Sequence, residues 1–351
     1  MRSTPLVRAC SVVLGLLLAA SGCSTSSDAP REQNSAVMAS SSGQPGAETA
    51  ATSRYVLAIS VDGLNRRAIT KLGKEGAPNF HRLIRRGAST LNARTELERT
   101  ITLPNHTGML TGRRVDKDRG GHGVFFNDDN GRTVHDAAGH HVSSVFREVH
   151  AHGRKTALFA SKTKFRFFKR SWPASVDTIT IDLDNARLVD RTRADLVAHP
   201  HAFTFLHLSL PDVVGHAKDF MSRPYLRAVR STDKRLGELL RTIRHHTRLR
   251  EGMTVILTAD HGGPTGSGNH GDMTRRANYQ VPFIMWGAGV TKGADLYDLN
   301  PAYRNPGKDR RGYAAERQPI RNGDVANVAL TMLGMSEVRG SEHDVRQDLR
   351  P

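Results

Sequence analysis

The stretch Tyr55-Val56-Leu57-Ala58-Ile59-Ser60-Val61, followed by Asp62 and Gly63, decides the fold class. It is almost continuously apolar and lacks the polar–apolar alternation of a strand with one solvated face, so it predicts a strand buried on both faces. Such strands belong to mostly parallel sheets that helices cover on both sides. An acidic residue directly after the strand lies at the carboxyl edge of the sheet, where open α/β sheets bind their ligands.

Two further apolar runs end in residues of the same kind: Phe203–Leu210 before Asp212 and His216, and Met253–Ala259 before Asp260 and His261, with His270 downstream. The four-residue spacing of Asp212 and His216 places both on one side of a helical turn. Taken singly, each residue is explained as a turn, cap or surface residue. Their recurrence at three strand ends favours a site for two Zn²⁺-like ions, which mixed carboxylate and imidazole ligands suit.

The remaining pattern alternates strands with helices, which indicates an α/β fold with a mostly parallel central sheet. The periodicity predicts further strands at 155–160, 178–183 and 281–286, and helices at 78–86, 102–110, 142–152, 187–198, 225–247 and 324–333. The polar stretch 112–141, rich in Gly, Asp and His, is interpreted as a functional loop or small cap.

The N-terminus indicates export. Residues 1–23 are predicted to be a signal peptide, because Ser11–Ala20 is apolar, follows two arginines and is too short to span a bilayer. The run that ends at Cys23 resembles a bacterial lipobox, so Cys23 is the expected lipidation site and the protein an outward-facing membrane lipoprotein; ordinary secretion is the alternative. Residues 24–53 are expected to be a flexible linker and 54–351 the folded domain.

The composition is that of a soluble globular protein, with 38% hydrophobic and 24% charged residues in 351. The formal net charge of +17 is unusual and would concentrate anions such as phosphorylated molecules or an anionic surface. A solvated arginine-rich surface is the alternative explanation. No module that combines aromatic and basic residues is recognisable, so no specific nucleic-acid partner is expected.

Thr102-Leu103-Pro104-Asn105-His106 supplies a candidate nucleophile. It places a hydroxyl just before a predicted helix N-terminus, where free N–H groups and the helix dipole favour an anion such as phosphate. A threonine hydroxyl needs a base or a metal to become nucleophilic at neutral pH. The alternative is that Thr102 only caps the helix.

Together these motifs resemble the alkaline phosphatase superfamily and, within it, the type I phosphodiesterase/nucleotide pyrophosphatase family. The resemblance covers residues 54–334 and rests on five segments in family order: Val61-Asp62-Gly63, Thr102–His106 with Thr111-Gly112, Gly121-His122-Gly123-Val124 leading to Asn127, Pro211-Asp212 with Gly215-His216, and Thr258-Ala259-Asp260-His261-Gly262-Gly263. It implies an alkaline-phosphatase-like catalytic domain with small loop or cap insertions.

The resemblance implies roles for single residues. One zinc ion would be held by Asp62, Asp260 and His261 and would bind the oxygen of Thr102, and the other would be held by Asp212, His216 and His270. Asn127 and the Leu103 N–H would hold the phosphoryl oxygens. The expected protein is an exported zinc phosphohydrolase that cleaves phosphodiester or pyrophosphate bonds of a phosphorylated small molecule, possibly a nucleotide, through a phosphothreonine.

Two departures from the family leave alternatives open. His270 follows His261 by only nine residues, where nucleotide pyrophosphatases usually carry a long insertion. Lys162-Thr163-Lys164 lies where some monoesterases of the superfamily use a Lys-x-Arg pair to grip phosphate, so a phosphomonoesterase is an alternative; a solvated basic loop is another interpretation of Lys162. The alternating basic and aromatic run 164–170 is interpreted as lining a substrate cleft or resting on an anionic surface, and the alternative is a loop that buries its phenylalanines. A non-catalytic, anion-binding surface lipoprotein is the alternative from another class.

Overall fold

The computed structural model describes residues 53–345 and 347–351. The predicted signal peptide, the Cys23 lipidation site and the linker up to residue 52 lie outside the described residues. The strands are β1 (Tyr55–Val61), β2 (Ala88–Arg94), β3 (Thr156–Ala160), β4 (Thr178–Ile181), β5 (Phe203–Leu208), β6 (Met253–Thr258), β7 (Gln280–Gly287) and β8 (Ala294–Asp295).

These strands form one sheet in the order β4-β3-β5-β1-β6-β7-β2-β8. The pairs of β1 with β5 and with β6 are parallel, whereas β7 is antiparallel to both β6 and β2. The sheet is therefore mostly parallel, as predicted. Because β5, β1 and β6 are neighbours, their carboxyl ends meet at one edge of the sheet, which we call the metal edge.

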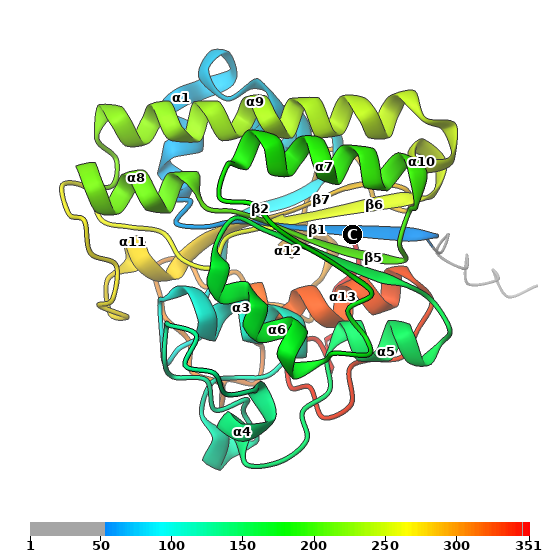
Figure 1. Cartoon of the computed structure of the whole chain (residues 1–351). Coiled ribbons are helices and arrows are strands. Elements are labelled where there is room, and N and C mark those ends of the chain that lie inside the picture. The colour runs from blue at the N-terminus through cyan, green and yellow to red at the C-terminus, as the bar shows by residue number, and fades with distance from the viewer. Residues whose placement is uncertain (1–52, 346) are drawn as a thin grey trace, which may run out of the picture. The chain divides into compact units, whose positions relative to one another are not determined.

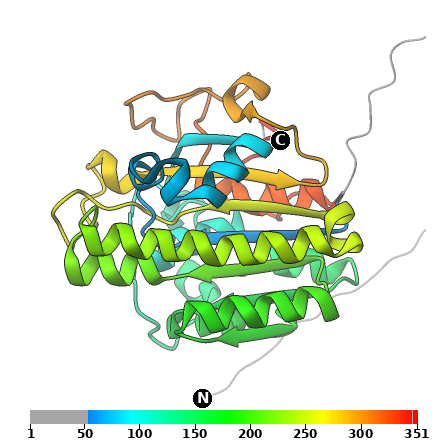
Figure 2. The same ribbon diagram turned by 90° about the horizontal axis from the view of Figure 1, so that it is seen from above.

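Helices cover both faces of the sheet (Figure 1). One face carries α1 (Arg66–Gly76), α2 (Pro78–Arg86), α7 (Asn185–Ala198), α8 (Leu210–Lys218), α9 (Arg223–His245) and α10 (Thr247–Gly252). The other face carries α3 (Thr102–Thr111), α5 (Val145–Ala151), α6 (Arg166–Ser171) and α13 (Val325–Met332). The short helices α4 (Val134–Ala138), α11 (Arg276–Tyr279) and α12 (Leu296–Leu299) complete the domain. Figure 2 looks down on the first layer, where α9 and α7 lie side by side along the strands.

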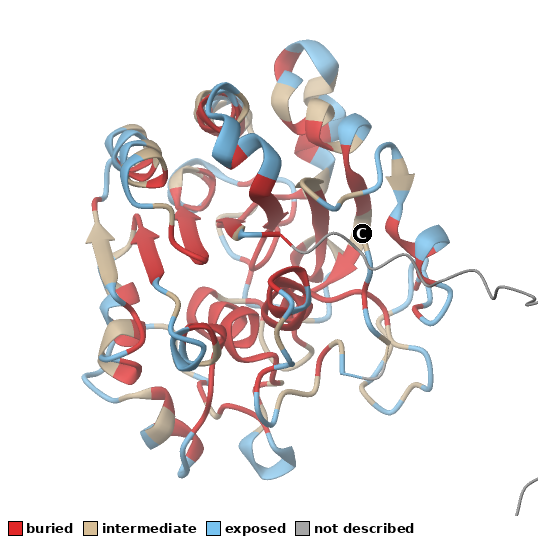
Figure 3. Ribbon diagram, turned by 90° about the vertical axis from the view of Figure 1, so that its right-hand side faces the viewer, coloured by how far each residue is buried: buried red, intermediate tan, exposed pale blue. Residues whose placement is uncertain are grey.

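The core lies between the sheet and the two helical layers (Figure 3). Val56, Leu57, Ala58, Ile59 and Val61 of β1 are at most 1% exposed, which agrees with a strand buried on both faces. The long helix α9 turns its apolar side inward, and its buried Asp233 accepts hydrogen bonds from the backbone N–H groups of Asn79 and Phe80 at the start of α2. This carboxylate satisfies free donors of a helix that has no side-chain cap of its own.

The structure differs from the sequence predictions in several elements. The strand predicted at 203–210 ends at Leu208, because Leu210 already begins α8 with proline at its second position. Asp212 therefore lies in the first turn of a helix rather than directly after a strand. The elements that were not predicted are α1, β2, α4, α6, α10, α11, β8 and α12. No helix in the described part of the chain is both long and apolar enough to cross a bilayer.

Candidate metal centre

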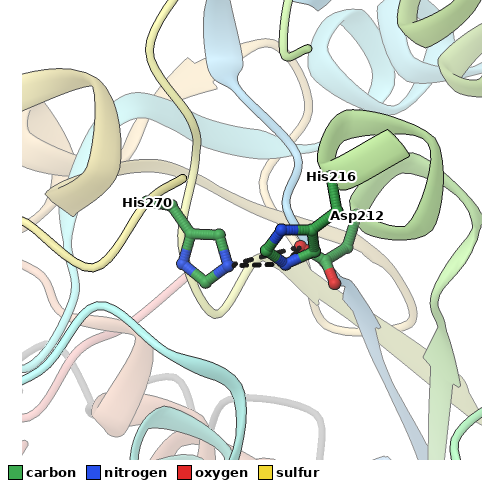
Figure 4. A group of neighbouring side chains, drawn as sticks. All are labelled: Asp212, His216 and His270. Atoms are coloured by element: carbon green, nitrogen blue, oxygen red, sulfur yellow. Dashed lines mark hydrogen bonds and ion pairs between the residues drawn. The ribbon is translucent and has the colours of Figure 1, made fainter. Parts of the chain in front are cut away.

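Two groups of Asp and His side chains lie at the metal edge. Asp62, Asp260 and His261 form one triad, and Asp212, His216 and His270 form the other; within each triad the ligand atoms lie within 4.8 Å of one another. The triads adjoin, because the rings of His261 and His270 stack with their centroids 3.5 Å apart. Figure 4 shows the second triad, with His216 and Asp212 on α8 and His270 on the loop that follows β6.

The three histidines share one hydrogen-bonding pattern. The Nδ1 atoms of His216, His270 and His261 lie 2.7–2.8 Å from the carbonyl oxygens of Gly268, Thr100 and Gly262. A carbonyl can only accept, so each Nδ1 carries the proton and each Nε2 presents a lone pair to the centre. Outer hydrogen bonds of this kind orient histidines that bind metals.

Among the described residues, this centre has too few positive charges and hydrogen-bond donors for its buried acceptor atoms. Four fully buried atoms have no hydrogen-bond partner: Asp62 Oδ1, Asp212 Oδ1, Asp260 Oδ2 and His261 Nε2. The Nε2 atoms of His216 and His270 lie only 3.1 Å apart, although both present lone pairs. Buried acceptors that face one another are costly without a cation. The donor set therefore fits divalent cations, and its mixture of nitrogen and oxygen ligands suits zinc.

The protonation states of the two buried histidines agree with metal binding. Burial lowers the pKa of His261 and lowers that of His270 to about 2, so both imidazoles are neutral at physiological pH. Burial and the neighbouring Asp62 charge raise the pKa of Asp260 well above its usual range. For Asp62 burial acts in the same sense, but the Lys162 ammonium and a hydrogen bond from His207 hold its pKa well below the usual value.

Lys162 reaches from the loop after β3 into the centre, so it is not a solvated surface residue. Its Nζ lies 2.6 Å from Asp62 Oδ2 and 2.7 Å from Asp212 Oδ2, and it donates to Thr102 Oγ1 at 3.4 Å. Its ammonium is thus shared by a carboxylate from each triad and the candidate nucleophile. These carboxylates raise the pKa of Lys162 although burial opposes the shift.

Thr102 is the first residue of α3 and is 1% exposed. Ile101 holds the N-cap position and no side chain caps the helix, so the hydroxyl of Thr102 is not used as a cap. Asn127 lies beside it, but its Oδ1 accepts the Leu103 N–H at 3.0 Å. The two groups expected to hold phosphoryl oxygens therefore bond to each other in this structure.

Two buried histidines behind the centre were given no role from the sequence: His207 was not named, and His106 was noted only as part of the Thr102–His106 motif. His207 Nε2 donates to Asp62 Oδ2 at 2.8 Å, and His106 bridges Ser60 Oγ and the Thr102 carbonyl, each at 2.8 Å. Both imidazoles are fully buried. The signal for His207 was a polar residue inside an otherwise buried strand, but only the pairing of β1 with β5 shows which ligand it contacts.

Phe220 joins the segments that carry the ligands. Its ring lies edge-on to His216 and His270, with centroids 6.0 and 5.8 Å apart. Gly63, Gly215 and Gly263 all approach this ring so closely that a Cβ on any of them would lie within 3.1 Å of it. Glycine is therefore required beside Asp62, His216 and His261 so that one aromatic ring can hold the three segments together.

The aromatic residues of the run 164–170 do not line a cleft. Phe165, in the turn before α6, and Phe167 and Phe168 of α6 itself are completely buried. Lys164 does lie near the centre, where its Nζ donates to the carbonyl of Asn127. The alternation of basic and aromatic residues thus reflects a half-buried helix.

Comparison with known proteins shows which family the chain belongs to. The model of the type I phosphodiesterase / nucleotide pyrophosphatase family matches residues 56–322. GPI ethanolamine phosphate transferase 1 of Chaetomium globosum is 30% identical over 153 residues, which are 44% of this chain and 16% of that protein. Phosphopentomutase of Rhizobium leguminosarum bv. trifolii is 34% identical over 146 residues, 41% of this chain and 30% of that protein. The matched segment thus spans less than a third of either relative.

Solved structures share the fold. Murine ectonucleotide pyrophosphatase / phosphodiesterase 5, an inactive variant in complex with AMP, superposes with a TM-score of 0.62 at 14% identity, over 85% of this chain and all of the other. The lipoteichoic acid synthase LtaP from Listeria monocytogenes has a TM-score of 0.58 at 12% identity, over 84% of this chain and 76% of the other. Because the family model spans more than half of the chain, the protein belongs to the type I phosphodiesterase / nucleotide pyrophosphatase family.

Proposed function

We propose that the chain is a zinc-dependent hydrolase of phosphodiester or pyrophosphate bonds that works through a phosphothreonine. One observation carries the proposal. The hydroxyl of Thr102, the first residue of α3, does not cap the helix, and it lies beside two triads whose buried acceptor atoms have no hydrogen-bond partners. The family supports phosphoester hydrolysis, and the donor chemistry supports zinc.

The proposed reaction assigns a role to several residues of the chain. Thr102 Oγ1 attacks phosphorus in line and the leaving oxygen departs on the opposite side; water then hydrolyses the phosphothreonine. Two divalent cations at the triads would supply the positive charge that such displacements need at the attacking and leaving oxygens. The N-terminus of α3 and the side-chain NH2 of Asn127 would bind the non-bridging oxygens once the bond between Leu103 N–H and Asn127 Oδ1 opens, and their polarity would contribute through electrostatic stabilisation.

The position of Lys162 favours a second candidate, a phosphomonoesterase on the same site. A monoester dianion carries one more negative charge than a diester and gains more from an ammonium beside the nucleophile. Lys162 Nζ is 3.4 Å from Thr102 Oγ1, close enough to contact a phosphoryl group bound there. Lys162→Met should therefore lower kcat/KM for an aryl monoester far more than for an aryl diester if the monoesterase is correct.

The nucleophile is tested by Thr102→Ala. We expect turnover to be lost while zinc content and the circular dichroism spectrum stay as in the wild type. Thr102→Ser, which keeps a hydroxyl, is the matched control and should retain measurable turnover. The assays are zinc analysis and hydrolysis of aryl diester, aryl monoester and dinucleotide substrates. Full activity in Thr102→Ala would contradict the mechanism, and a zinc-loaded wild type without turnover on any of these substrates would favour the anion-binding lipoprotein.

We also propose that the protein is exported and anchored through lipid at Cys23. The support is the short apolar segment and the lipobox-like run before Cys23. Mass spectrometry of the N-terminus from membranes of the producing cell should find a lipidated Cys23. Cys23→Ser should move the protein from the membrane to the soluble fraction, and an unprocessed Met1 terminus on the wild type would contradict the proposal.

A further inference from the structure

The edge of the sheet opposite the metal centre is strongly basic. The strands β1, β2, β3 and β6 all begin there, because they run parallel to one another toward the metal edge. Six exposed cations lie in the helix ends and loops that lead into these strands: Arg54, Arg85, Arg86, Lys155, Arg241 and Arg248. We call this surface the basic edge. Figure 3 views it end-on to the strands, with exposed residues in pale blue.

Two carboxylates near the basic edge have other partners than the six cations. Asp177 accepts the backbone N–H of Thr156, and Glu251 pairs with Arg250 at 2.9 Å. None of the six cations forms an ion pair with a carboxylate in the part of the chain that the structure describes. Cations in the last turn of a helix are favoured by its dipole, which accounts for Arg85 and Arg86 of α2 but not for Arg54 or Lys155.

The start of the described chain lies at the same edge. Ser53 and Arg54 are tied to it by backbone hydrogen bonds to Met332 and Gly252, immediately before β1. A flexible segment of about 30 residues has a root-mean-square length of roughly 30 Å. Any attachment of residues 1–23 to a membrane would therefore join the folded domain at the basic edge rather than at the metal edge.

We propose that the basic edge is a docking surface for an anionic lipid bilayer. Basic residues beside a lipid anchor add to its membrane affinity, and a tether raises the effective concentration of the surface at the bilayer. Nucleic acid fits less well, because grooves for single strands present stacking aromatic rings. The exposed phenylalanine of the described residues, Phe125, lies in the loop beyond α3 and not at this edge.

Docking would set which substrates reach the site. The seven residues of β1 separate the basic edge from Asp62, a distance of roughly 20 Å at about 3.3 Å per residue. Headgroups of the docked bilayer are then out of reach of the metal centre. The substrate would come from the aqueous side and not from the membrane that the domain lies on.

Vesicle co-sedimentation tests the surface without any turnover. We use the chain from Ser24 onward, which keeps the entire core between Val56 and Leu349 and lacks the apolar segment that would itself bind lipid. Its partitioning is measured on phosphatidylcholine vesicles with and without one third phosphatidylglycerol. The edge variant combines four exposed changes, Arg85→Gln, Arg86→Gln, Lys155→Gln and Arg241→Gln.

A control variant loses the same net charge elsewhere through Lys117→Gln, Lys218→Gln, Arg304→Gln and Lys308→Gln, all at exposed positions. Each cation near an anionic surface contributes about five-fold, so the edge variant should bind phosphatidylglycerol vesicles about a hundred-fold or more weakly and the control nearly normally. Equal losses in both variants, or equal binding to neutral vesicles, would overturn the proposal. So would an edge variant that loses binding to a 20-nucleotide DNA strand but keeps its vesicle binding. Turnover of a soluble aryl diester should be the same in all three proteins, which separates this test from that of the catalytic proposal.

Discussion

Gly263→Ala tests the packing that joins the ligand segments. A Cβ at position 263 would lie 2.1 Å from Cγ of Phe220 and 2.2 and 2.5 Å from its Cδ1 and Cδ2, far inside van der Waals contact. Cε1 of the same ring also packs closely against Gly63 and Gly215, where an added Cβ would lie 3.1 and 2.5 Å from it, so these backbone segments restrict how far the ring can shift. The new methyl group must therefore displace the loop that carries His261.

The cost follows from this overlap. Adding a methyl group to a packed core destabilises a protein by about 1–3 kcal/mol. Because three ring carbons are overlapped, we expect the upper end, about 3 kcal/mol, which is roughly a 150-fold change in the unfolding equilibrium. Zinc affinity should fall as well, since His261 follows the displaced backbone.

The assay is urea unfolding followed by circular dichroism, together with zinc titration. Gly312→Ala is the matched control, because no atom lies within 4 Å of its added Cβ, and it should leave the unfolding midpoint unchanged. Phe220→Leu removes the ring, so the double variant with Gly263→Ala should be less destabilised than the sum of the two single changes. A Gly263→Ala protein as stable as Gly312→Ala, or strict additivity, would refute the packing argument.

Three further predictions concern the metal centre and its surroundings. His207→Leu removes the donor to Asp62 Oδ2 and should weaken zinc binding about 10- to 100-fold, as measured by competition with a chromophoric chelator. His207→Gln should weaken zinc binding less. Equal zinc affinities in the wild type and both variants would contradict the role of His207. Zinc at 100 times its dissociation constant should stabilise the fold by about 2.7 kcal/mol and raise the melting temperature by about 5 °C over the chelated protein; an unchanged melting temperature would exclude binding at the buried acceptors. Burial raises the pKa of Asp324 to about 6, so its contribution to stability is complete below about pH 4 and is lost as pH rises through 6. Asp324→Asn keeps an acceptor for the Arg321 N–H but does not titrate. The unfolding free energy of this variant should therefore fall less between pH 4 and 7 than that of the wild type. Parallel plots of unfolding free energy against pH would show that Asp324 does not titrate in this window.

Much of the fold was predictable because buried parallel strands and amphipathic helices leave clear periodic patterns. The predicted strands at 55–61 and 253–259 agree with β1 and β6 to within a residue, and the predicted long helix agrees with α9 to within two. β2 was missed because Ala88–Arg94 mixes Ser, Thr, Asn and Arg with few apolar residues and contains a register shift between Thr90 and Ala93. Its partner β7 supplies the apolar surface that this segment lacks, and the local sequence does not show which strand the segment pairs with.

The candidate metal ligands could be predicted from the sequence for a different reason. Asp62 and Asp260 follow strong strand signals, and the four-residue spacing of Asp212 and His216 suits the helix α8 on which they lie. The contacts of Lys162 and His207 could not be predicted from the sequence, because each residue contacts a carboxylate 50 to 145 positions away in the chain. The burial of the phenylalanines in α6 was left open for the same reason, since it depends on what the helix packs against.

The sequence by itself determined a parallel α/β sheet with Asp and His at three strand ends, because strand burial and helix spacing are local properties. Only the tertiary structure decided that β5, β1 and β6 are neighbours, and therefore that these residues form two adjoining triads with Thr102 and Lys162 beside them. It also decided that the cations preceding the strands gather on the opposite edge. Strand order is set by packing between segments distant in the chain, and no local pattern encodes it.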